Sequence, residues 1–599
     1  MKTYASRKDK RLTSRSSKAF MIPLILVMSI LPLIMLLYEY DSGLSIYKWF
    51  PDNNSQMDIF LYYKQKFFII VCSVMLILVI FKTYKERKNI KFLPTFIPLA
   101  LYGLLALTST LFSEHPSFGL KGMHEQFESI FVILGYCLLV YYAYLFIDTE
   151  EDIKFLFRYF LIGIAVMIVI GLLQFTGNDP FGANYGKKLY LPKEYWNQLD
   201  SFGLTFGDRI VYLTLYNPNY AGLYTGFILP IITGLLLTER RKKQIIEYSI
   251  VIIGLILCLI GSKSKAGFIG LLISLIFVVI FFRKYIFRNK VVTISLIGVG
   301  VLAMAFLFII KGNAISNAMN HVLNPAKSNY ALTNIKTEEA LTITYKNNDL
   351  VITSDPDNVF NIIMKDASGN DIPFTYDAET AIYTITDERF AGIRVVTDYL
   401  EDILCTQVTI DGKDWIFSNQ LGDGTYYYLN VYGKFDKIVE AESALFTGHE
   451  SIATGRGYIW SRSIPLLKDN IILGSGADTF ALEFPHQDYV NYYNAGFEGE
   501  VLTKPHSLYL QIGVQSGVIS LIAFITFYLM YFISSFKLYI KGHFDNFFKQ
   551  AGVSIFLGTI AYMIIGISND STLTVAPIAW ALIGVGIACN YKVKGQMEC

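Results

Sequence analysis

The chain has 599 residues, of which 53% are hydrophobic and only 17% are charged, and its formal net charge at pH 7 is +2. Soluble domains usually carry about a quarter of charged residues, so this composition excludes an ordinary soluble protein, and no nucleic acid is expected among the partners. The cysteines exclude a disulfide framework and a cysteine metal site, because only Cys405 and the C-terminal Cys599 lie away from apolar runs.

The N-terminal segment is basic and leads into the apolar run Phe20–Tyr38. This run is too long for the core of a signal peptide, and no small-residue cleavage site follows it. We therefore predict an anchored first membrane span. Two carboxylates, Glu39 and Asp41, follow at its outer end.

Further apolar runs recur along the chain, and a helix needs about 20 residues to cross the hydrocarbon layer. We predict about twelve spans in all, with membrane lipids as partners. After the first span they are Phe67–Phe81, Phe92–Phe112, Ile130–Ile147, Tyr159–Phe175, Ala221–Leu237, Ile245–Ile260, Ala266–Phe282, Val291–Ile310, Ser507–Phe536, Ala551–Ile567 and Leu573–Cys589.

The distribution of positive charge predicts the orientation, because cytoplasmic loops carry an excess of Lys and Arg. The basic loops all fall on one side of this threading; they lie at residues 82–91, 240–243, 283–290 and 537–549. We predict that both termini are cytoplasmic and that the loop 311–505 is extracytoplasmic. The chain then divides into an N-terminal membrane region (1–310), this loop, and a C-terminal membrane region (506–599).

Within the loop, short runs alternate apolar and polar residues between turn clusters, as in Leu341–Tyr345 and Thr406–Ile410. Such runs at regular spacing predict a β-sandwich or small barrel. We place this all-β insert at about 333–439, and a helical segment at 441–505. Tyr426, Tyr427 and Tyr428 could stack on sugars, but a Tyr-rich stretch favours an ordinary strand.

The segment after the insert carries the chemistry. Arg456 stands in a Gly-Arg-Gly turn that opens an amphipathic segment, and His506 lies where the loop turns into a long apolar helix. A fixed cation and an imidazole that titrates near neutrality, both at one membrane surface, suit chemistry on a lipid-linked phosphate.

Three motifs of this stretch resemble the O-antigen ligase and polymerase family of bacterial polytopic glycosyltransferases. They are Thr454-Gly-Arg-Gly-Tyr-Ile-Trp460, Ile472-Leu-Gly-Ser-Gly476 and His506-Ser-Leu-Tyr-Leu510. The resemblance implies a GT-C-like polytopic α-helical membrane protein, here with an inserted all-β domain. It also implies a metal-independent, inverting transfer with no cofactor, from an undecaprenyl-diphosphate-linked glycan to an acceptor hydroxyl at the outer face of the cell membrane.

The resemblance adds further candidates. Ser264-Lys265 stands where the family has Ser-Arg, in a short outward link that also contains Lys263. Lysine keeps the charge but loses the bidentate fork of arginine. Arg209 is a weaker candidate for a third cation. Asn217-Pro218-Asn219 also matches the family; it is typical of a helix start, and Asn217 and Asn219 are candidate glycan contacts.

In the implied reaction, Arg456 and Lys265 hold the diphosphate, and His506 accepts the proton of the acceptor hydroxyl. The acceptor stays open: a glycan, a lipid, a wall polymer and a protein side chain all fit. So does a polymerase in place of a ligase. A flippase for lipid-linked sugars and a membrane-anchored binding protein are the alternatives outside this class, and a metal held by Glu39 and Asp41 is the alternative mechanism.

Overall fold

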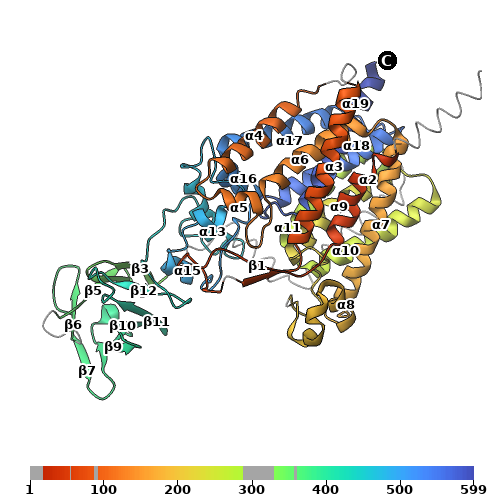
Figure 1. The fold of residues 1–599 in the computed structure, drawn as a ribbon. Coiled ribbons are helices and arrows are strands. Elements are labelled where there is room, and N and C mark those ends of the chain that lie inside the picture. The colour runs from red at the N-terminus through yellow and green to blue at the C-terminus, as the bar shows by residue number, and fades with distance from the viewer. Residues whose placement is uncertain are drawn as a thin grey trace, which may run out of the picture.

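The computed structural model describes residues 18–53, 55–86, 92–204, 206–287, 330–355 and 361–598. The predicted span Val291–Ile310 and the basic N-terminal segment lie outside these residues. The described chain forms a bundle of helices and a separate β part at one end of it (Figure 1).

Eight helices of the described chain are long and apolar enough to cross a membrane, which makes the protein a multi-pass helical membrane protein. They are α3 (Tyr62–Glu86), α7 (Glu150–Phe175), α9 (Pro218–Thr238), α10 (Lys242–Ser262), α11 (Lys265–Ile286), α17 (Val518–Tyr539), α18 (Phe547–Ile565) and α19 (Ala576–Glu598). Three shorter apolar helical stretches join them: Ile22–Leu33, α4 (Phe96–Leu111) and α6 (Ile130–Phe146). The prediction of about twelve spans is therefore confirmed only as a multi-pass arrangement.

The helices differ in how much of their apolar surface they bury in the protein. The apolar surfaces of α9, α18 and α19 are almost entirely buried in the protein. Helix α9 packs against α10, α11 and α18. At the crossing of α9 and α11, a Cβ on Gly267 would lie 2.6 Å from the carbonyl oxygen of Gly222, so glycine permits close contact. By contrast, Ile70, Ile77 and Ile80 of α3 point outward, as lipid-facing side chains do.

The first predicted span, Phe20–Tyr38, is wrong in its last five residues, because the helical structure ends at Leu33. Helical structure over Ile22–Leu33 includes a π turn and ends at a 3-10 turn that contains Pro32, because proline has no N–H and interrupts the helical ladder. The chain then extends into β1 (Tyr38–Asp41), which pairs with β2 (Ser55–Asp58). Buried Lys64 of α3 donates to the freed carbonyl of Ile34 at 2.7 Å and to that of Thr214 at 2.8 Å.

The predicted single span Ser507–Phe536 is also wrong, because it is two helices. α16 (Leu508–Ser516) ends at Gly517, whose φ is +97°, and α17 begins at the next residue. A Cβ at Gly517 would lie 2.6 Å from the carbonyl oxygen of Ile472. The break therefore needs glycine for both its backbone angle and its space.

The all-β region predicted in the loop is confirmed. Its strands form two antiparallel meanders, one of four strands and one of seven. The first holds β3 (Leu332–Thr337), β4 (Leu341–Tyr345), β5 (Asn348–Ser354) and β6 (Ile362–Asp366). The second holds β7 (Phe374–Asp377), β8 (Ile382–Ile385), β9 (Arg394–Leu400), β10 (Ile403–Ile410), β11 (Lys413–Ser418), β12 (Tyr427–Leu429) and β13 (Phe435–Asp436).

The two sheets share one hydrophobic core around the fully buried Trp415. Tyr426 and Tyr428 belong to this core, so their rings serve packing, as an ordinary strand predicts. The core extends beyond the expected limits 333–439, because Val490 of the short helix α15 (Tyr489–Asn494) is buried in it and the Tyr493 ring meets Trp415 edge-on at 5.6 Å.

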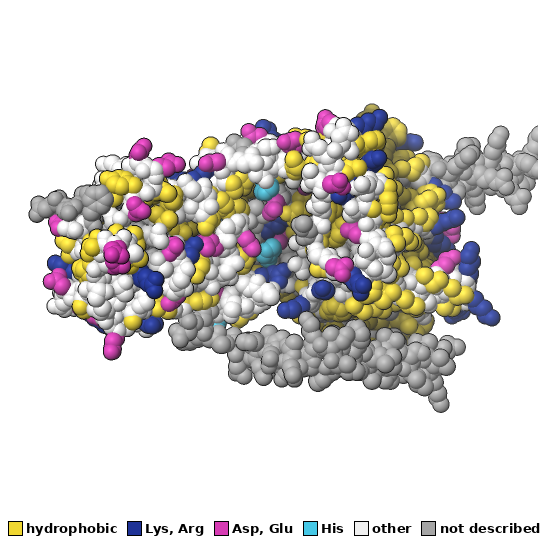
Figure 2. Space-filling model, turned by 90° about the horizontal axis from the view of Figure 1, so that it is seen from below, with side chains coloured by type: hydrophobic (Ala, Val, Ile, Leu, Met, Phe, Trp, Pro, Cys, Tyr) yellow, Lys and Arg dark blue, Asp and Glu magenta, His cyan; other side chains and the backbone are white. Residues whose placement is uncertain are grey.

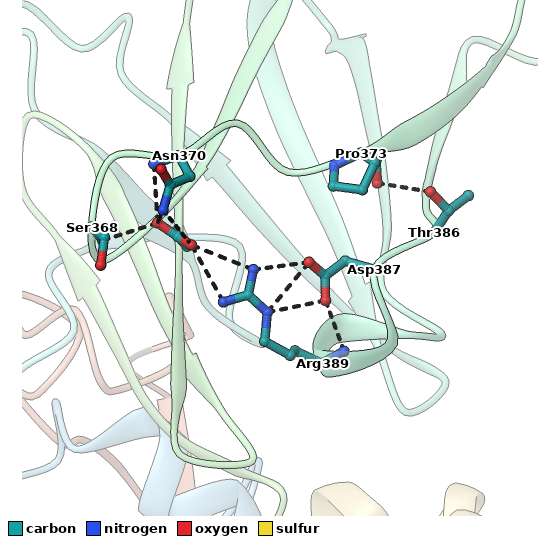
Figure 3. A network of polar contacts seen from close by, with 7 residues as sticks. Ser368, Asn370, Pro373, Thr386, Asp387 and Arg389 are labelled. Atoms are coloured by element: carbon teal, nitrogen blue, oxygen red, sulfur yellow. Dashed lines mark hydrogen bonds and ion pairs between the residues drawn. The ribbon is translucent and has the colours of Figure 1, made fainter.

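An ion-pair network joins the two sheets at one end (Figure 3). The guanidinium of Arg389 lies 3.3 Å from Asp366, at the end of β6, and 2.9 Å from Asp387, between β8 and β9. Asp366 also accepts the backbone N–H groups of Ser368 and Asn370 and so holds the turn between β6 and β7. The network is solvent-exposed, so it fixes the turn more than it stabilises the fold.

The β part docks on the loop that follows the first helix. Lys434, between β12 and β13, donates to the backbone carbonyls of Ser45, Tyr47 and Phe50. The remaining short helices of the helical part are α5 (Pro116–Lys121), α8 (Asn184–Tyr190), a 3-10 helix (Lys193–Ser201), α13 (Arg456–Leu466) and α14 (Phe480–Glu483). A further 3-10 helix, Glu388–Phe390, lies between β8 and β9.

Candidate active site

His506 and Asp570 form the centre of the candidate site. His506 Nδ1 lies 3.0 Å from Asp570 Oδ2, and the second oxygen of this carboxylate accepts the backbone N–H of Ser507 at 3.1 Å. An ionised carboxylate accepts but cannot donate, so it fixes the tautomer that carries its proton on Nδ1. The unprotonated Nε2 then belongs to a ring whose side chain is 39% exposed.

The backbone supports this orientation. His506 has φ of +50°, a left-handed conformation that is uncommon for a residue with a side chain. Ser507 is the N-cap residue of α16, and the next N–H, that of Leu508, donates to the carbonyls of Gly566 and Asn569. The loop between α18 and α19 thus holds both the ring of His506 and the start of the helix behind it.

Arg456 begins α13 after a turn of three left-handed residues, Ala453, Thr454 and Gly455. A Cβ at Gly457 would lie 2.5 Å from the carbonyl oxygen of His449. Glycine at this position therefore permits close contact between the start of α13 and the protein's own backbone.

The guanidinium of Arg456 has unused donors. Its Nε is buried without a hydrogen-bond partner in the described chain, and its only bond there is a long one of 3.5 Å to the carbonyl of Ala453. Burial lowers the pKa of Arg456, and the nearby Asp570 opposes this shift. One turn on, Trp460 donates to the carbonyl of Pro505 at 3.1 Å, so the α13 start and the His506 segment are tied together.

Lys504 is the second cation of the cluster, and sequence reasoning missed it. It is buried, donates to the hydroxyl of Tyr220 at 3.1 Å, and lies over the rings of Tyr216 and Tyr220. Burial alone would lower its pKa, but the Tyr220 hydroxyl and the charges of Asp570 and Glu125 hold that pKa above its ordinary value. Lys504 therefore stays protonated.

Two carboxylates, Asp570 and Glu125, place negative charge near these cations. Burial alone would raise the pKa of Asp570, but the charge and hydrogen bond of His506, with the charges of Lys504 and Arg456, hold it below its ordinary value. Asp570 is therefore ionised. The other carboxylate near Lys504, Glu125, accepts from the Thr503 hydroxyl at 3.0 Å.

The motif Asn217-Pro218-Asn219 starts α9. The Asn217 side chain accepts the N–H of Asn219 at 2.8 Å and so caps the helix, which agrees with the helix-start reading. Asn219 is half-buried, and no hydrogen bond of its side chain with the His506 cluster is present in the described chain. The residue that follows this motif, Tyr220, does lie in the cluster, where its hydroxyl accepts from Lys504.

The predicted second cation site lies beside α9 but outside the cluster. Ser264 caps α11, and a Cβ at Gly222 would lie 2.1 Å from the Cβ of Ser264, so the link packs on the first turns of α9. Lys263 and Lys265 are exposed. Within the described residues neither amine has a hydrogen bond or ion pair, and both are free to meet an anion.

Arg209 lies apart from the cluster. Its side chain is 71% exposed and 3.7 Å from Asp208. Glu39 accepts from the hydroxyls of Ser55 and Tyr195, each at 2.8 Å, and Asp41 accepts the N–H of Gly43. No three His, Cys, Asp or Glu side chains of the described chain are grouped to hold a metal ion.

A second pair of acids lies behind the cluster. Glu128 accepts from Ser571 at 2.6 Å, next to Asp570, and also from Gln511. Asp478 accepts the N–H groups of Met123 and Glu128. Burial, followed by the charge of Glu128, raises the pKa of Asp478 to about 8, so this carboxyl is mostly protonated at neutral pH.

The fold and the site together define a multi-pass membrane protein with a histidine–carboxylate pair and two cations at one end of its helices. Residues 421–525 match a family model described as O-Antigen ligase. The match includes Arg456 and His506, and it confirms the resemblance seen in the three sequence motifs. No curated protein matches the chain.

Proposed function

We propose that this protein is a glycosyltransferase of the outer face of the cytoplasmic membrane, which transfers a glycan from undecaprenyl diphosphate to an acceptor hydroxyl. The observation that carries the proposal is His506, whose Nδ1 is fixed by Asp570 while its ring stays accessible. The family match over residues 421–525 supports the same reaction class.

The reaction needs one proton acceptor and one anion site. His506 Nε2 accepts the proton of the acceptor hydroxyl as its oxygen attacks the anomeric carbon. The bond from that carbon to the diphosphate breaks, and the lipid diphosphate leaves with the electron pair. Attack from the face opposite the leaving group inverts the anomeric configuration.

Arg456 is the best placed residue to hold the departing diphosphate, because its guanidinium has donors without partners. The charges of Arg456 and Lys504 are balanced by those of Asp570 and Glu125. A diphosphate therefore needs further cations, and the exposed Lys265 and Lys263 in the link beside α9 are available for this role.

The distribution of surface charge supports the orientation. Hydrophobic side chains cover a broad surface of the helical part, and Lys and Arg side chains gather at its end remote from the β part, at the right of Figure 2. Positive charge marks the cytoplasmic side. The β part and the His506 cluster then face outward, where a glycan on undecaprenyl diphosphate and its acceptor meet.

The test is transfer by purified protein from a synthetic polyprenyl-diphosphate glycan, with donor binding measured separately. His506→Ala should lower transfer by about a hundred-fold or more and leave donor binding intact. Arg456→Ala should weaken donor binding by about one to two powers of ten, because it removes charge-assisted contacts.

Two matched controls lie at the other end of the helices. His543 lies between α17 and α18 and Arg283 in the last turn of α11, and both are exposed, so His543→Ala and Arg283→Ala should behave as the wild type. Full transfer by His506→Ala would refute the proposal. The length of the products separates a ligase, which transfers once, from a polymerase, which extends its acceptor repeatedly.

A further inference from the structure

A pocket opens where three distant segments meet. Trp49 comes from the loop after the first helix, Tyr432 from the turn after β12, and His486, Tyr489 and Tyr492 from the segment before His506. The β part and the helical part both contribute, so the pocket forms where the β part docks, close to the contacts that Lys434 makes.

The walls of this pocket are aromatic. The Trp49 ring is stacked on His486 with centroids 4.2 Å apart and planes 20° apart. Trp49, Tyr432 and Tyr489 are half-buried and His486 is almost fully buried. His486 covers one face of the Trp49 ring, so the accessible apolar surface comes from the half-buried rings of Trp49, Tyr432 and Tyr489. Flat apolar surfaces suit the C–H faces of a ring that carries its polar groups around its edge.

Polar groups at the rim are available to a ligand. Glu500 is exposed, and no bond of its carboxylate occurs in the described chain; the same holds for the Tyr432 hydroxyl. Both Glu498 and Glu500 line the pocket. Glu498 has a partner in Lys413, whereas Glu500 adds an uncompensated negative charge.

We propose that this pocket binds a neutral sugar unit of the glycan. Aromatic walls supply contact area for a pyranose ring, and the Glu500 carboxylate accepts hydrogen bonds from its hydroxyl groups. The negative rim repels phosphate and acidic sugars. The pocket is therefore distinct in chemistry from the cationic cluster around Arg456.

The position of the pocket fits a glycan that reaches the site, and in this respect the inference rests on the proposed function. The chain from Glu500 to His506 spans at most about 20 Å. Along it, the N–H of Leu502 donates to the Tyr492 hydroxyl and Thr503 bonds Glu125. This short, anchored segment joins the pocket to the His506 cluster and gives the β insert a role in glycan recognition.

The test is calorimetric binding of three tetrasaccharides to the full-length protein in detergent, without donor. The probes are tetramers of N-acetylglucosamine, glucose and galacturonic acid. At least one neutral tetramer should bind, and the galacturonate tetramer should not. Tyr432→Ala and Trp49→Ala should each weaken neutral binding about tenfold, and Trp49→Phe should retain most of it.

A variant that gains binding tests the proposal independently of folding defects, because a misfolded protein would not acquire a new ligand. Glu500 is exposed, and Glu500→Lys should allow the galacturonate tetramer to bind. Tyr185 is 68% exposed on α8, away from the pocket, and Tyr185→Ala is the control for surface aromatic loss. Absence of neutral binding to the wild type, or equal binding by Trp49→Ala and Tyr432→Ala, overturns the proposal.

These outcomes are separate from those of the transfer assay. Binding is measured without any reaction, and it can be repeated on His506→Ala, whose pocket is unchanged. If tetrasaccharides bind as expected but no transfer occurs in any variant, the pocket proposal stands and the proposed function fails. If transfer depends on His506 but no tetrasaccharide binds, only the pocket proposal fails.

Discussion

His506 Nδ1 lies 3.0 Å from a carboxylate oxygen of Asp570, although 64 positions separate the two residues in the chain. His506 lies just before α16, and Asp570 lies between α18 and α19. Because Asp570 also accepts the N–H of Ser507, the carboxylate fixes the imidazole and the helix start at the same time.

Replacing Asp570 by asparagine should separate its charge from its shape. Asp570→Asn keeps an oxygen for the Ser507 N–H but no longer stabilises the histidine cation that forms when His506 accepts a proton. Transfer should fall by about a hundred-fold or more, while donor binding should not weaken, because the site becomes more positive. Single-turnover transfer and donor binding measure the two effects.

The control for this change is Asp148→Asn. Asp148 pairs with Lys82 and Lys592 at the opposite end of the helices, so transfer should be unaffected there. A wild-type rate in Asp570→Asn would show that His506 needs no carboxylate.

The two lysine positions should respond differently to removal of charge. Lys504→Met leaves Asp570 and Glu125 without their buried counter-charge, which should lower the free energy of unfolding by about 3–5 kcal/mol. Lys265→Met removes an exposed amine and should leave the thermal midpoint unchanged. If Lys265 holds the diphosphate, its loss weakens donor binding about tenfold.

Lys265→Arg is the matched variant for this comparison. It keeps the charge and adds a phosphate-matching fork, so donor binding should be retained or improved. Donor binding that is equal in Lys265→Met and the wild type would remove Lys265 from the anion site.

Stability should depend on pH through Asp478. Its pKa is about 8 in the folded protein against an ordinary 3.8, with burial as the largest cause. The folded state then binds the proton more tightly than the unfolded state, so the free energy of unfolding should fall as pH rises from about 4 to about 8. Asp478→Asn should flatten this dependence and raise stability at pH 8.

Thermal melting of the purified protein across this pH range measures the effect. Asp469 is exposed, and Asp469→Asn is the control that should leave the profile unchanged. The same decline in the wild type and Asp478→Asn would place its origin in another group, with Glu128 the first candidate because burial raises its pKa as well.

The orientation can be tested with two equally accessible positions. Tyr84 is 82% exposed near the end of α3, and Leu445 is 81% exposed in the loop after the β part. A cysteine at Leu445 should react with a membrane-impermeant maleimide in intact cells, and one at Tyr84 only after lysis. The described native cysteines are buried or half-buried, which keeps the background low; labelling of Tyr84→Cys in intact cells would reverse the threading.

Local patterns predicted much of the fold. The strand expected at Leu341–Tyr345 has these limits in β4, and the span expected at Ala266–Phe282 lies within α11. Alternation and long apolar runs are properties of a single segment, so they can be read without knowledge of its neighbours. The errors lie at Pro32 and Gly517, where one residue breaks an apolar run that hydropathy treats as continuous.

The site was only half visible in the sequence. Arg456 and His506 stand in recognisable motifs, whereas Asp570 is one acid in a short polar loop between two spans. Lys504 lies two residues before His506, and a lysine so close to the His506 motif is a usable signal in the sequence. The contact between His506 and Asp570 depends on how α16, α18 and α19 pack together. No local sequence pattern shows how separate helices pack.

Helix α15 packs against two parts of the protein, the core of the β part and helix α13. Val490 and Tyr493 complete the core around Trp415, while Tyr492 packs edge-on against Tyr458 of α13, the helix that Arg456 begins. An exchange of the β domain between related chains therefore cannot be made by cutting at 333 and 439 alone. The transplanted β domain would have to present a surface that packs against Val490 and Tyr493. A poor fit there would shift α15 and, through Tyr492 and Tyr458, the helix that Arg456 begins.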